Sequence, residues 1–346
     1  MDPVTGWTAG PAPGESVWLR IEEASSAAGA RRQAAAIAAP LGFSAQRLAE
    51  IQLAATEAAT NLQRHAVQGE MVLSTVRTGD SVALDLVCMD TGPGMADVSR
   101  SLRDGHTTGG TLGVGLGTIS RLADAFDLHS LPDRGTVMTA RFALEPQPEG
   151  GYATGGLIRP LLGEEVSGDR FAFCVSEGVG YAMLCDGLGH GPLAARASEE
   201  AVRAFRDLPG RPSPEAILRR LHAALAGTRG GALAVAAIDA GRGSVAFAGL
   251  GNVAGWIVRP DGRQGMISAP GIAGHQARTF REHRYTLPAG ATVLLHSDGL
   301  TDRWKPADYP GLFSRGPLVA AGALMRDAGV RRDDRAILAV KAVDDG

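Results

Sequence analysis

The sequence predicts a protein of two α/β domains, and three observations lead to this prediction. The chain has 346 residues, about twice the length of a common domain. A segment rich in proline and glycine, EPQPEGGYATGG at residues 145–156, follows the alternating pattern of TVMTARFAL, as expected where a domain ends. The hydrophobic share of 45% and the charged share of 21% suffice for a core in each domain. We predict domains at residues 1–147 and 157–346, with a linker at residues 148–156.

The first domain is predicted to be a sheet with helices on one face. A strand near residues 17–21 precedes an alanine-rich helix at about residues 26–39 and a second helix at residues 45–65. Two strands follow, MVLSTVRT and VALDLVCMD, then a glycine-rich loop, a helix starting near Gly115 and a last strand at residues 136–144. This order is typical of an α/β layer built on a mixed sheet.

The second domain is predicted to consist mainly of short strands. These are FAFCVSEG, YAMLCD, ALAVAAID, SVAFAGL, AGWIVRP and TVLLHSD, separated by turns such as DAGRGS and RPDGRQ. Three helices interrupt them, near residues 192–208, 214–226 and 317–328. Antiparallel sheets with flanking helices fit this order best.

The composition excludes several classes of partner. A formal net charge of −3 and a pI near 6.3 give no positive field to hold nucleic acid or an anionic membrane. The start, MDPVTGWTAGPAPGES, lacks the basic run and apolar core of a signal peptide, and no later apolar run has membrane-spanning length. A cytoplasmic protein is expected. Cys88, Cys174 and Cys185 lie in apolar strands without C-x-x-C spacing, which predicts buried reduced thiols.

The glycine-rich stretch GTLGVGLGTI, residues 110–119, raises the question of which phosphate it approaches. A dinucleotide fingerprint requires G-x-G-x-x-G between a strand and a helix. Here the spacing is Gly113-x-Gly115-x-Gly117, and the preceding residues form the loop RDGHTTGGT. The dinucleotide reading therefore fails, and the stretch has to be interpreted with its neighbours.

One further segment of the first domain places polar groups on one face of a helix, and another places a carboxylate beside glycines. The helix QRLAEIQLAATEAATNLQRHA puts Glu57 and Asn61 four residues apart on one face. The strand VALDLVCMD ends at Asp90, followed by Gly92 and Gly94, which let a ligand approach the backbone.

Together these segments resemble the GHKL ATP-binding fold, an α/β sandwich, and within it the serine kinases of bacterial partner-switching and stressosome pathways. The resemblance rests on EAATNLQRHA, MDTGPGM, RDGHTTGGTLGVGLGTISRLADAFDL and RGTVMTARF, which cover most of residues 45–142. It implies ATP with Mg²⁺ as ligand: Asn61 coordinates Mg²⁺, Asp90 accepts a hydrogen bond from the adenine amino group, and Thr136 supports the adenine end. The glycines would bring backbone N–H groups to the phosphates at a helix N-terminus.

The same resemblance assigns a general base and a lid. Glu57 precedes the Mg²⁺ ligand by one helical turn, where it can take the proton from a serine or threonine hydroxyl. The loop at residues 96–111 is expected to close over the nucleotide. Arg100 and Arg103 lie in this loop and are left out of the predicted site.

In the second domain, acidic residues recur at strand ends beside glycine. They are Asp169 in SGD, Asp186 in CDGLGHG, Asp298 in HSDGL, and Asp333 and Asp334 in RRDDRAIL. Carboxylates that converge in one cleft raise one another's pKa, and a bound cation is the natural compensation. Ligands that are all oxygen favour Mg²⁺ or Mn²⁺ over zinc.

These motifs resemble the metal-dependent protein phosphatase superfamily, an α-β-β-α sandwich, and its bacterial sporulation stage II protein E branch. The likeness runs from about Gly163 to the C-terminus. It implies a pair of Mn²⁺ or Mg²⁺ ions, with Asp186 bridging them and Asp169 in or just outside the first ligand sphere. It further assigns the Gly187 carbonyl to one ion, and Asp298 and Asp333 to the other.

The second motif set departs from the family pattern at one place. The family's DD-M-T is replaced by residues 333–336, Asp-Asp-Arg-Ala, so the sequence leaves open whether Asp333 or Asp334 is the ligand. His190, inside DGLGHG, is assigned no role.

The two resemblances together predict a bifunctional enzyme, a protein serine/threonine kinase fused to a phosphatase that removes the same kind of phosphate. The implied substrate is a STAS-domain partner, either a stressosome scaffold or an anti-sigma factor antagonist, with a sigma factor or downstream regulator as a further partner. Two alternatives stay open: a phosphatase gated by a catalytically inactive ATP-sensing domain, and a nucleotide-dependent module that binds a sigma factor or STAS protein. A homodimer is also left open.

Overall fold

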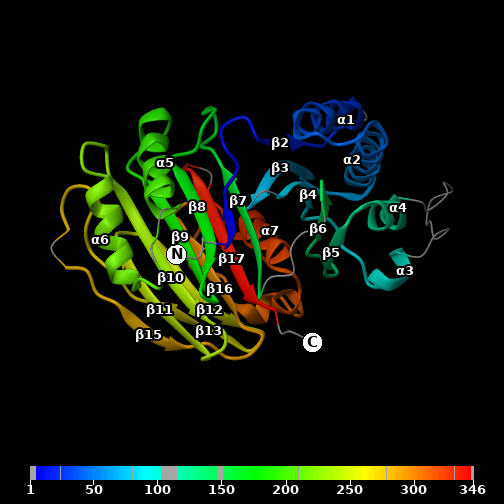
Figure 1. Cartoon of the computed structure of the whole chain (residues 1–346). Coiled ribbons are helices and arrows are strands. Elements are labelled where there is room, and N and C mark those ends of the chain that lie inside the picture. Colours follow the sequence, from blue (N-terminus) through cyan, green and yellow to red (C-terminus); the bar gives the residue numbers. More distant parts are fainter. Residues whose placement is uncertain are drawn as a thin grey trace. The chain divides into compact units, whose positions relative to one another are not determined.

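The chain divides into two compact units. The computed structural model describes residues 5–23, 25–79, 81–102, 115–145, 151–206, 208, 210–277, 279–330 and 332–343. The N-terminal unit comprises Pro11–Gln147, and the C-terminal unit comprises Met1–Gly10 together with Pro148–Gly346. Figure 1 follows the chain from its blue start to its red end. The first ten residues thus belong to the C-terminal unit, whereas the sequence assigns them to the first domain.

The N-terminal unit contains a five-stranded sheet in the order β2-β3-β4-β6-β5. The strands are β2 (Ser16–Arg20), β3 (Glu70–Thr78), β4 (Ser81–Met89), β6 (Thr136–Ala143) and β5 (Ala125–Ser130). All four pairings between these neighbours are antiparallel, where the sequence predicts a mixed sheet. The strands β4 and β5 do run parallel to each other, but β6 lies between them and pairs antiparallel with both.

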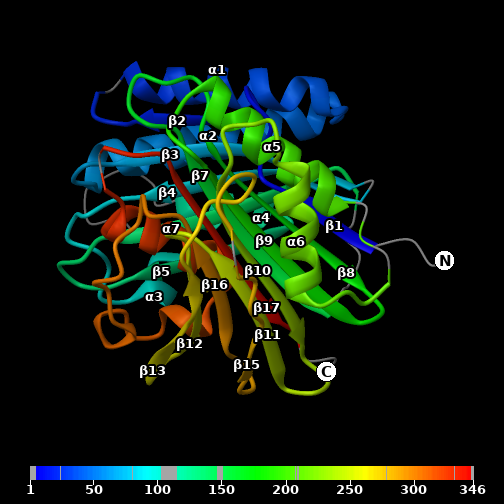
Figure 2. The ribbon, with the colours of Figure 1, turned by 90° about the vertical axis from the view of Figure 1, so that its left-hand side faces the viewer.

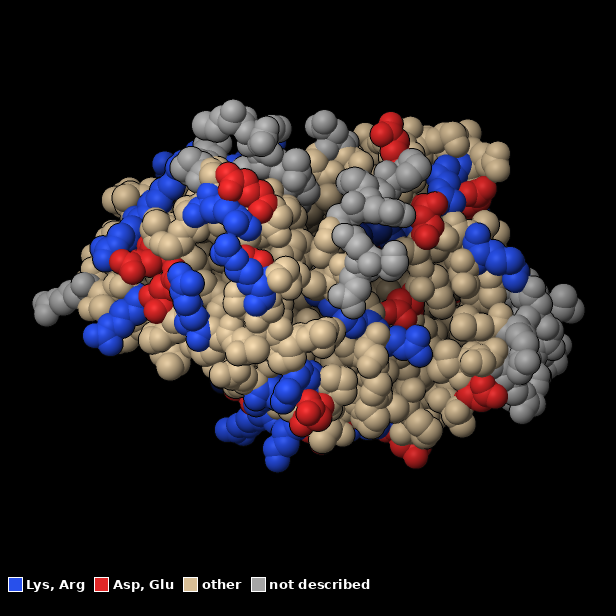
Figure 3. Space-filling view, turned by 60° about the horizontal axis from the view of Figure 1, so that its bottom comes forward, with Lys and Arg blue, Asp and Glu red and all other residues tan. Residues whose placement is uncertain are grey.

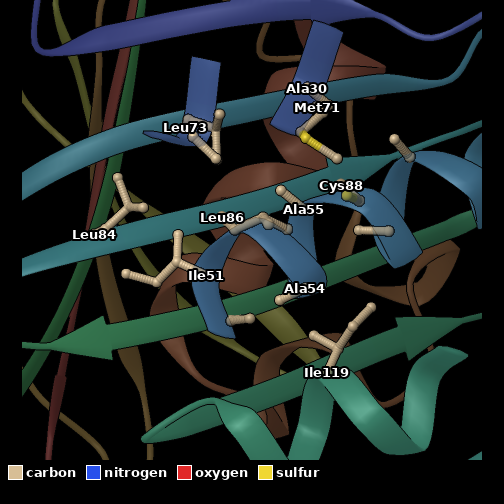
Figure 4. Close-up of a cluster of buried hydrophobic side chains, with 14 of the residues drawn as sticks. Ala30, Ile51, Ala54, Ala55, Met71, Leu73, Leu84, Leu86, Cys88 and Ile119 are labelled. Atoms are coloured by element: carbon tan, nitrogen blue, oxygen red, sulfur yellow. The ribbon is translucent and has the colours of Figure 1, made fainter. Parts of the chain in front are cut away.

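Helices cover one face of this sheet, as predicted. They are α1 (Ser25–Ala38), α2 (Ala45–His65) and α4 (Gly115–Leu122), with a short α3 (Val98–Leu102) and a 3₁₀ turn (Ala39–Leu41). Ser44 caps α2, since its hydroxyl accepts a hydrogen bond from the Arg47 N–H at 3.2 Å. Ile51, Ala54 and Ala55 of α2 lie over side chains from β3 and β4 in Figure 4.

The C-terminal unit is a sandwich of two sheets. The first sheet has the order β14-β11-β10-β9-β8-β1, with β15 beside β11, and the second has the order β13-β12-β16-β17-β7. Its members are β14 (Ser268–Ala269), β11 (Ser244–Leu250), β10 (Gly231–Asp239), β9 (Val179–Gly187), β8 (Asp169–Ser176), β1 (Thr5–Ala9) and β15 (His283–Thr286). The second sheet contains β13 (Gly262–Met266), β12 (Ala254–Arg259), β16 (Thr292–His296), β17 (Arg335–Ala342) and β7 (Tyr152–Arg159).

Helices flank both sheets, which gives the predicted α-β-β-α order. Phe171 and Leu184 of the first sheet pack against Leu295 and Leu338 of the second. On the outer face of the first sheet lie α5 (Pro192–Arg206) and α6 (Pro214–Ala224), as Figure 2 shows. Outside the second sheet, α7 (Pro317–Ala328) packs on β7 and β17, near two 3₁₀ turns (Pro306–Asp308 and Leu312–Ser314).

Strand β1 is an addition to the phosphatase-like sheet that the sequence did not predict. It pairs antiparallel with β8, with Thr8 opposite Phe173. The Trp7 ring centroid lies 5.9 Å from that of Phe205 in α5, and the Arg206 guanidinium lies 5.8 Å above the Trp7 ring. Residues that precede the N-terminal unit in the chain are therefore part of the C-terminal core.

Strand β7 occupies part of the predicted linker. It begins at Tyr152 and pairs along its length with β17. A β-carbon on Gly155 would lie 2.2 Å from the Leu318 backbone nitrogen, and one on Gly156 would lie 2.4 Å from the Phe171 ring. These glycines are thus required by close packing of α7 and the first sheet, although their clustering resembles a flexible linker.

The remaining expectations for the fold have clear outcomes. The predicted helices and strands occur within a few residues of their predicted ends, whereas β5, β13, β14, β15 and the short helix α3 are not predicted by the sequence. All three cysteines are buried and unpaired. Among the described residues, no helix combines the length and hydropathy needed to cross a bilayer. Acidic and basic side chains both occur on the face in Figure 3.

Candidate functional site

In the N-terminal unit, Asp90 directly follows β4 and is held in a tight turn. Its backbone N–H donates to the Thr136 carbonyl at 3.0 Å, and its Oδ1 accepts a hydrogen bond from the Gly92 N–H at 2.7 Å. A β-carbon on Gly135 would lie 1.9 Å from the Asp90 carbonyl oxygen, and one on Gly92 would lie 2.9 Å from Oδ1. The carboxylate is buried, so its position is fixed by backbone contacts that only glycine permits.

The turn after Asp90 is tied to β5 and β6. Gly94 has a φ of +64°, and a β-carbon there would lie 2.0 Å from the Leu131 carbonyl oxygen. The Ser130 hydroxyl accepts a hydrogen bond from the Met95 N–H at 2.8 Å and lies 2.9 Å from the Thr136 hydroxyl. Three predicted residues, Asp90, Gly94 and Thr136, therefore belong to one hydrogen-bonded corner.

The polar stripe on α2 faces the start of α4. Glu57 and Asn61 are half-buried and His65 is exposed. The amide nitrogen Nδ2 of Asn61 is buried and has no hydrogen-bond partner among the described residues. A β-carbon on Gly115 would lie 2.8 Å from that nitrogen, so the Asn61 amide sits against the first residue of α4. The first N–H groups of a helix are unpaired and favour an anion.

Part of the predicted nucleotide site lies outside the described residues. This applies to Gly113 and to most of the predicted lid at residues 96–111. Of the glycine triplet, Gly115 begins α4 and Gly117 is buried within it.

In the C-terminal unit, both sheets bring carboxylates to the same end of the sandwich. Asp169 on β8 and Asp186 on β9 are direct cross-strand partners. Asp298 follows β16, and Asp333 and Asp334 precede β17 of the second sheet. A β-carbon on Gly299 would lie 1.9 Å from the Asp334 carbonyl oxygen. Five acidic positions predicted from separate motifs thus converge.

Burial and mutual repulsion set the pKa values of this acidic cluster. Desolvation, and then the charge of Asp186, raises the pKa of Asp169 well above its ordinary value. Desolvation, and then the charges of Asp298 and Asp333, raises the pKa of Asp186 to about 8. Desolvation and the neighbouring Asp333 also raise the pKa of Asp298. A side-chain hydrogen bond between the two carboxyl groups further raises the pKa of Asp186 and lowers that of Asp298. The cluster therefore attracts positive charge, whether protons or cations.

The two adjacent aspartates have different surroundings. Asp334 is 2% exposed, and its two carboxylate oxygens accept hydrogen bonds from the Leu161 N–H at 2.7 Å and the Gly168 N–H at 2.8 Å. Asp333 is half-buried, and its Oδ1 accepts a hydrogen bond from the Asp334 N–H at 2.9 Å. Asp334 thus holds the loop before β8. The charges of both aspartates raise the pKa of Asp186, and the charge of Asp333 also raises that of Asp298.

The acidic cluster fits a hard divalent cation by its donor chemistry. As arranged, no three His, Cys, Asp or Glu side chains of the described residues are close enough to hold a metal. However, all side-chain donors are oxygens, and Oδ2 of Asp169 is buried without a hydrogen-bond partner. This buried carboxylate oxygen has no hydrogen-bond partner and lies among carboxylates that repel one another. A bound Mg²⁺ or Mn²⁺ would stabilise such a group. Gly187 adjoins Asp186, and a larger residue would not fit there, because a β-carbon would lie 2.3 Å from the Ala194 carbonyl oxygen.

Several contacts around the cluster escaped the sequence interpretation. Asn252 donates a short hydrogen bond from Nδ2 to Asp298. His190 lies 2.7 Å from Glu164 through Nδ1, so this loop histidine has a carboxylate partner. The Asn252 signal is present in the sequence, because GN follows the apolar strand SVAFAGL as GD or DG follows others.

A stack of aromatic rings supports the segment after β16. The Arg263 guanidinium carbon lies 4.0 Å from the Trp256 ring centroid and 4.2 Å from that of Trp304. His296 is 1% exposed, and its Nε2 lies 3.1 Å from Oδ1 of Asp302. The hydrogen bond from His296 lowers the pKa of Asp302. This packing anchors the segment that carries Asp298, and no single motif could have revealed it.

Two family models match the two units. The model of the histidine kinase-like ATPase domain matches residues 21–142, which include Glu57, Asn61, Asp90 and the described glycines. The model of stage II sporulation protein E matches residues 176–342, which include Asp186, Asp298 and Asp333.

Known proteins resemble the chain in parts. Over 111 residues it is 34% identical to the serine/threonine-protein kinase RsbT of Bacillus subtilis (strain 168), a match that spans 32% of this chain and 84% of RsbT. It is 26% identical over 115 residues to an anti-sigma F factor of Thermoanaerobacter sp. (strain X514), spanning 32% of this chain and 79% of that protein. A solved structure from a study of the bacterial stressosome, described as a modular system adapted to control secondary messenger signalling, matches with a TM-score of 0.51 and 27% identity. That match covers 55% of this chain and 98% of the solved chain.

The match to RsbT spans 84% of that kinase, and the second family model, at residues 176–342, follows the first, at residues 21–142, without overlap. The chain therefore belongs to the histidine-kinase-like ATPase family that includes RsbT, and it joins this kinase-like domain to a phosphatase domain of the stage II sporulation protein E type.

Proposed function

We propose that the chain is a bifunctional protein serine/threonine kinase and phosphatase that controls the phosphorylation state of a STAS-domain partner. The partner would be a stressosome scaffold or an anti-sigma factor antagonist. The observation that carries the proposal is that each unit retains the side chains that the resemblance assigns to its reaction: the Glu57 and Asn61 stripe beside α4, and the acidic cluster at the end of the sandwich. The 34% identity to a serine/threonine kinase supports the first half.

For the kinase reaction, the residues of the N-terminal unit have separate roles. Asp90 would accept a hydrogen bond from the adenine amino group, with Gly92, Gly94 and Thr136 shaping that corner. Asn61 would hold Mg²⁺, which supplies charge neutralisation at the ATP phosphates. Gly113, Gly115 and Gly117 would offer backbone N–H groups to those phosphates.

Glu57 is proposed as the general base. It lies one helical turn before Asn61 on the same stripe of α2 and is half-buried. From there its carboxylate can take the proton of a serine or threonine hydroxyl as that oxygen attacks the terminal phosphorus of ATP. The bond from phosphorus to ADP breaks in the same step, so the partner gains the phosphoryl group.

For the phosphatase reaction, the acidic cluster would hold two cations, Mn²⁺ or Mg²⁺. When bound, they supply a nucleophilic water at neutral pH and neutralise charge on the phosphoryl group. Asp186 would bridge them, the Gly187 carbonyl and Asp169 would serve one of them, and Asp298 and Asp333 the other. The hydrogen bonds of Asp334 to Leu161 and Gly168 favour Asp333 as the ligand.

The two activities need separation in time or by substrate. One chain that ran both reactions freely on one partner would only hydrolyse ATP. We propose that partner binding, nucleotide state or different substrates keep them apart; equal unregulated rates on one partner would contradict this.

The proposal is tested by the intact mass of candidate STAS-domain proteins after incubation with ATP, Mg²⁺ and Mn²⁺. The wild-type chain is compared with Glu57→Ala and Asp186→Asn. We expect Asp186→Asn to accumulate a phosphorylated partner, because only hydrolysis is blocked, and Glu57→Ala to add no phosphate. His65→Ala is a matched control on the same stripe of α2, and it should behave as wild type.

The alternatives give different results in the same experiment. If no variant adds phosphate but the wild-type chain removes it from a phosphorylated partner, the N-terminal unit is an ATP sensor that gates the phosphatase. Partner capture that survives both substitutions, without turnover by the wild-type chain, identifies a nucleotide-dependent binding module.

A further inference from the structure

The loop that precedes β10 lies against the Asp186 loop. The Leu188 N–H donates to the Gly230 carbonyl at 2.9 Å, and Gly231 pairs with Gly187 in the β9–β10 register. A β-carbon on Gly231 would lie 2.3 Å from the Asp186 carbonyl oxygen. Residues 228–231 and the loop that begins at Asp186 are thus in direct backbone contact.

Arg229 extends from this loop over the loop that begins at Asp186, near Gly189. A β-carbon on Gly189 would lie 3.2 Å from Nη1 of Arg229, so the guanidinium rests over the backbone of the Asp186 loop. The side chain is exposed, and in the described part of the chain it makes no hydrogen bond or ion pair.

Hydrogen bonds hold the backbone around Arg229, whereas its side chain makes none in the described part of the chain. The Thr228 hydroxyl accepts a hydrogen bond from the Gly230 N–H at 2.9 Å and donates to the Leu225 carbonyl at 2.7 Å. Nε2 of His275 lies 3.1 Å from the Thr228 carbonyl oxygen. The anchored loop therefore holds a guanidinium over the Asp186 loop, and its donors make no hydrogen bond to the described residues.

A second arginine beside the cluster shows the contrasting arrangement. Arg170 is 6% exposed, its Nη1 donates to the Asp169 carbonyl at 3.3 Å, and its Nη2 lies 3.6 Å from Glu199. It is enclosed by protein and holds β8 in place. Of these two arginines, Arg229 is the one that a ligand can reach.

We propose that Arg229 binds the phosphoryl group of the phosphoserine or phosphothreonine substrate of the C-terminal unit. The inference rests on the proposed phosphatase function and names a residue that recognises its substrate. A phosphate dianion near clustered carboxylates needs positive charge on the side away from the cations. The planar guanidinium can donate two parallel hydrogen bonds to non-bridging oxygens.

The reaction leaves these contacts in place. Water attacks phosphorus, the bond from phosphorus to the serine oxygen breaks, and that oxygen takes a proton. The products are the free hydroxyl and inorganic phosphate. Because inorganic phosphate keeps the oxygens that Arg229 would bind, the product should compete for the same guanidinium.

The test compares wild type, Arg229→Gln and Arg229→Lys in hydrolysis of a phosphoserine-containing STAS partner, with inorganic phosphate as inhibitor. We expect Arg229→Gln to lower kcat/KM about tenfold or more and to raise the inhibition constant of inorganic phosphate by a similar factor. Arg229→Lys, which keeps the positive charge, should change kcat/KM and the inhibition constant of inorganic phosphate less than Arg229→Gln does. The Mn²⁺ concentration for half-maximal activity and the thermal midpoint should stay unchanged. Arg220→Gln, an exposed arginine of α6, is the matched control.

The outcomes separate this inference from the proposed function. An active wild type whose kcat/KM and phosphate inhibition are unaffected by Arg229→Gln overturns the role of Arg229 alone. If Arg229→Gln only raises the Mn²⁺ concentration for half-maximal activity, or only lowers the thermal midpoint, the role of Arg229 is also overturned. The arginine would then only support the loop. A wild type without any hydrolysis that depends on Asp186 overturns the proposed function and this inference together.

Discussion

At the scale of single residues, neighbours in the chain can differ fully in role, as Asp333 and Asp334 do. Both oxygens of Asp334 accept backbone N–H groups, so Asp334→Asn turns one acceptor into a donor facing an N–H. We expect a loss of about 1–3 kcal/mol in the free energy of unfolding, measured by denaturant titration. Asp333→Asn should leave that free energy within error and instead abolish hydrolysis. Equal effects of the two substitutions on both readouts would contradict the assignment.

Because the pKa of Asp186 is raised, the stability of the metal-free protein, measured in the presence of a chelator, should depend on pH. In the unfolded chain this carboxyl ionises near its ordinary value, and in the folded chain its pKa is about 8. A raised carboxyl pKa penalises folding increasingly as pH rises from about 4 to 8, and fully above that. Asp186→Asn removes the penalty, so its thermal midpoint should exceed that of wild type at pH 8 and match it near pH 4. Asp261→Asn, in the turn between β12 and β13, should show no such trend, and a pH-independent difference for Asp186→Asn would refute the explanation.

The site residues could be predicted to different extents. Motifs at strand ends located Asp169, Asp186 and Asp298, because a carboxylate beside glycine at the end of an apolar strand is visible locally. Asn252 follows an apolar strand as the aspartates do, but its contact with Asp298, like the approach of Arg229 to the Asp186 loop, comes from loops that meet only after folding. The choice between Asp333 and Asp334 likewise depends on partners far away in the chain, at Leu161 and Gly168.

At the scale of elements, β1 is the main surprise, and it yields a prediction. Trp7 packs on Phe205 and under Arg206, so Trp7→Ala should destabilise the C-terminal unit by about 2 kcal/mol. Hydrogen exchange should speed up in β8 and α5 and remain unchanged in β5 and β6. Trp18→Ala in β2 is the matched control and should speed exchange in β2 while leaving α5 unchanged. Faster exchange in β5 and β6 than in β8 and α5 on loss of Trp7 would contradict the placement of β1.

Most elements could be predicted because their periodicity is local, and the exceptions have physical reasons. The glycines of β7 permit α7 and Phe171 to approach, but in the sequence they look like a linker. β1 follows proline and glycine signals that favour a loop, and its strand character comes from pairing with β8. β17 directly follows the acidic motif, and its apolar run Ala336–Val340 indicates a strand there without fixing the bounds of that strand.

At the scale of the whole molecule, one chain carries a kinase-like domain of the RsbT family and a phosphatase domain of the stage II sporulation protein E type. Enzymes that add and remove the same phosphate oppose each other, and joining them fixes their ratio at one to one. Control must then act on their relative rates. A partner whose phosphorylated and unphosphorylated forms bind the two units differently would provide it.

The most direct measurement of this central claim is the mass of a STAS-domain partner incubated with the Asp186→Asn chain, ATP and Mg²⁺, before and after wild-type chain is added. The account predicts that a species heavier by one phosphate accumulates first and disappears once wild type and Mn²⁺ are present. A partner whose mass never increases with Asp186→Asn, although the same chain binds ATP, would contradict the claim that this protein is both kinase and phosphatase.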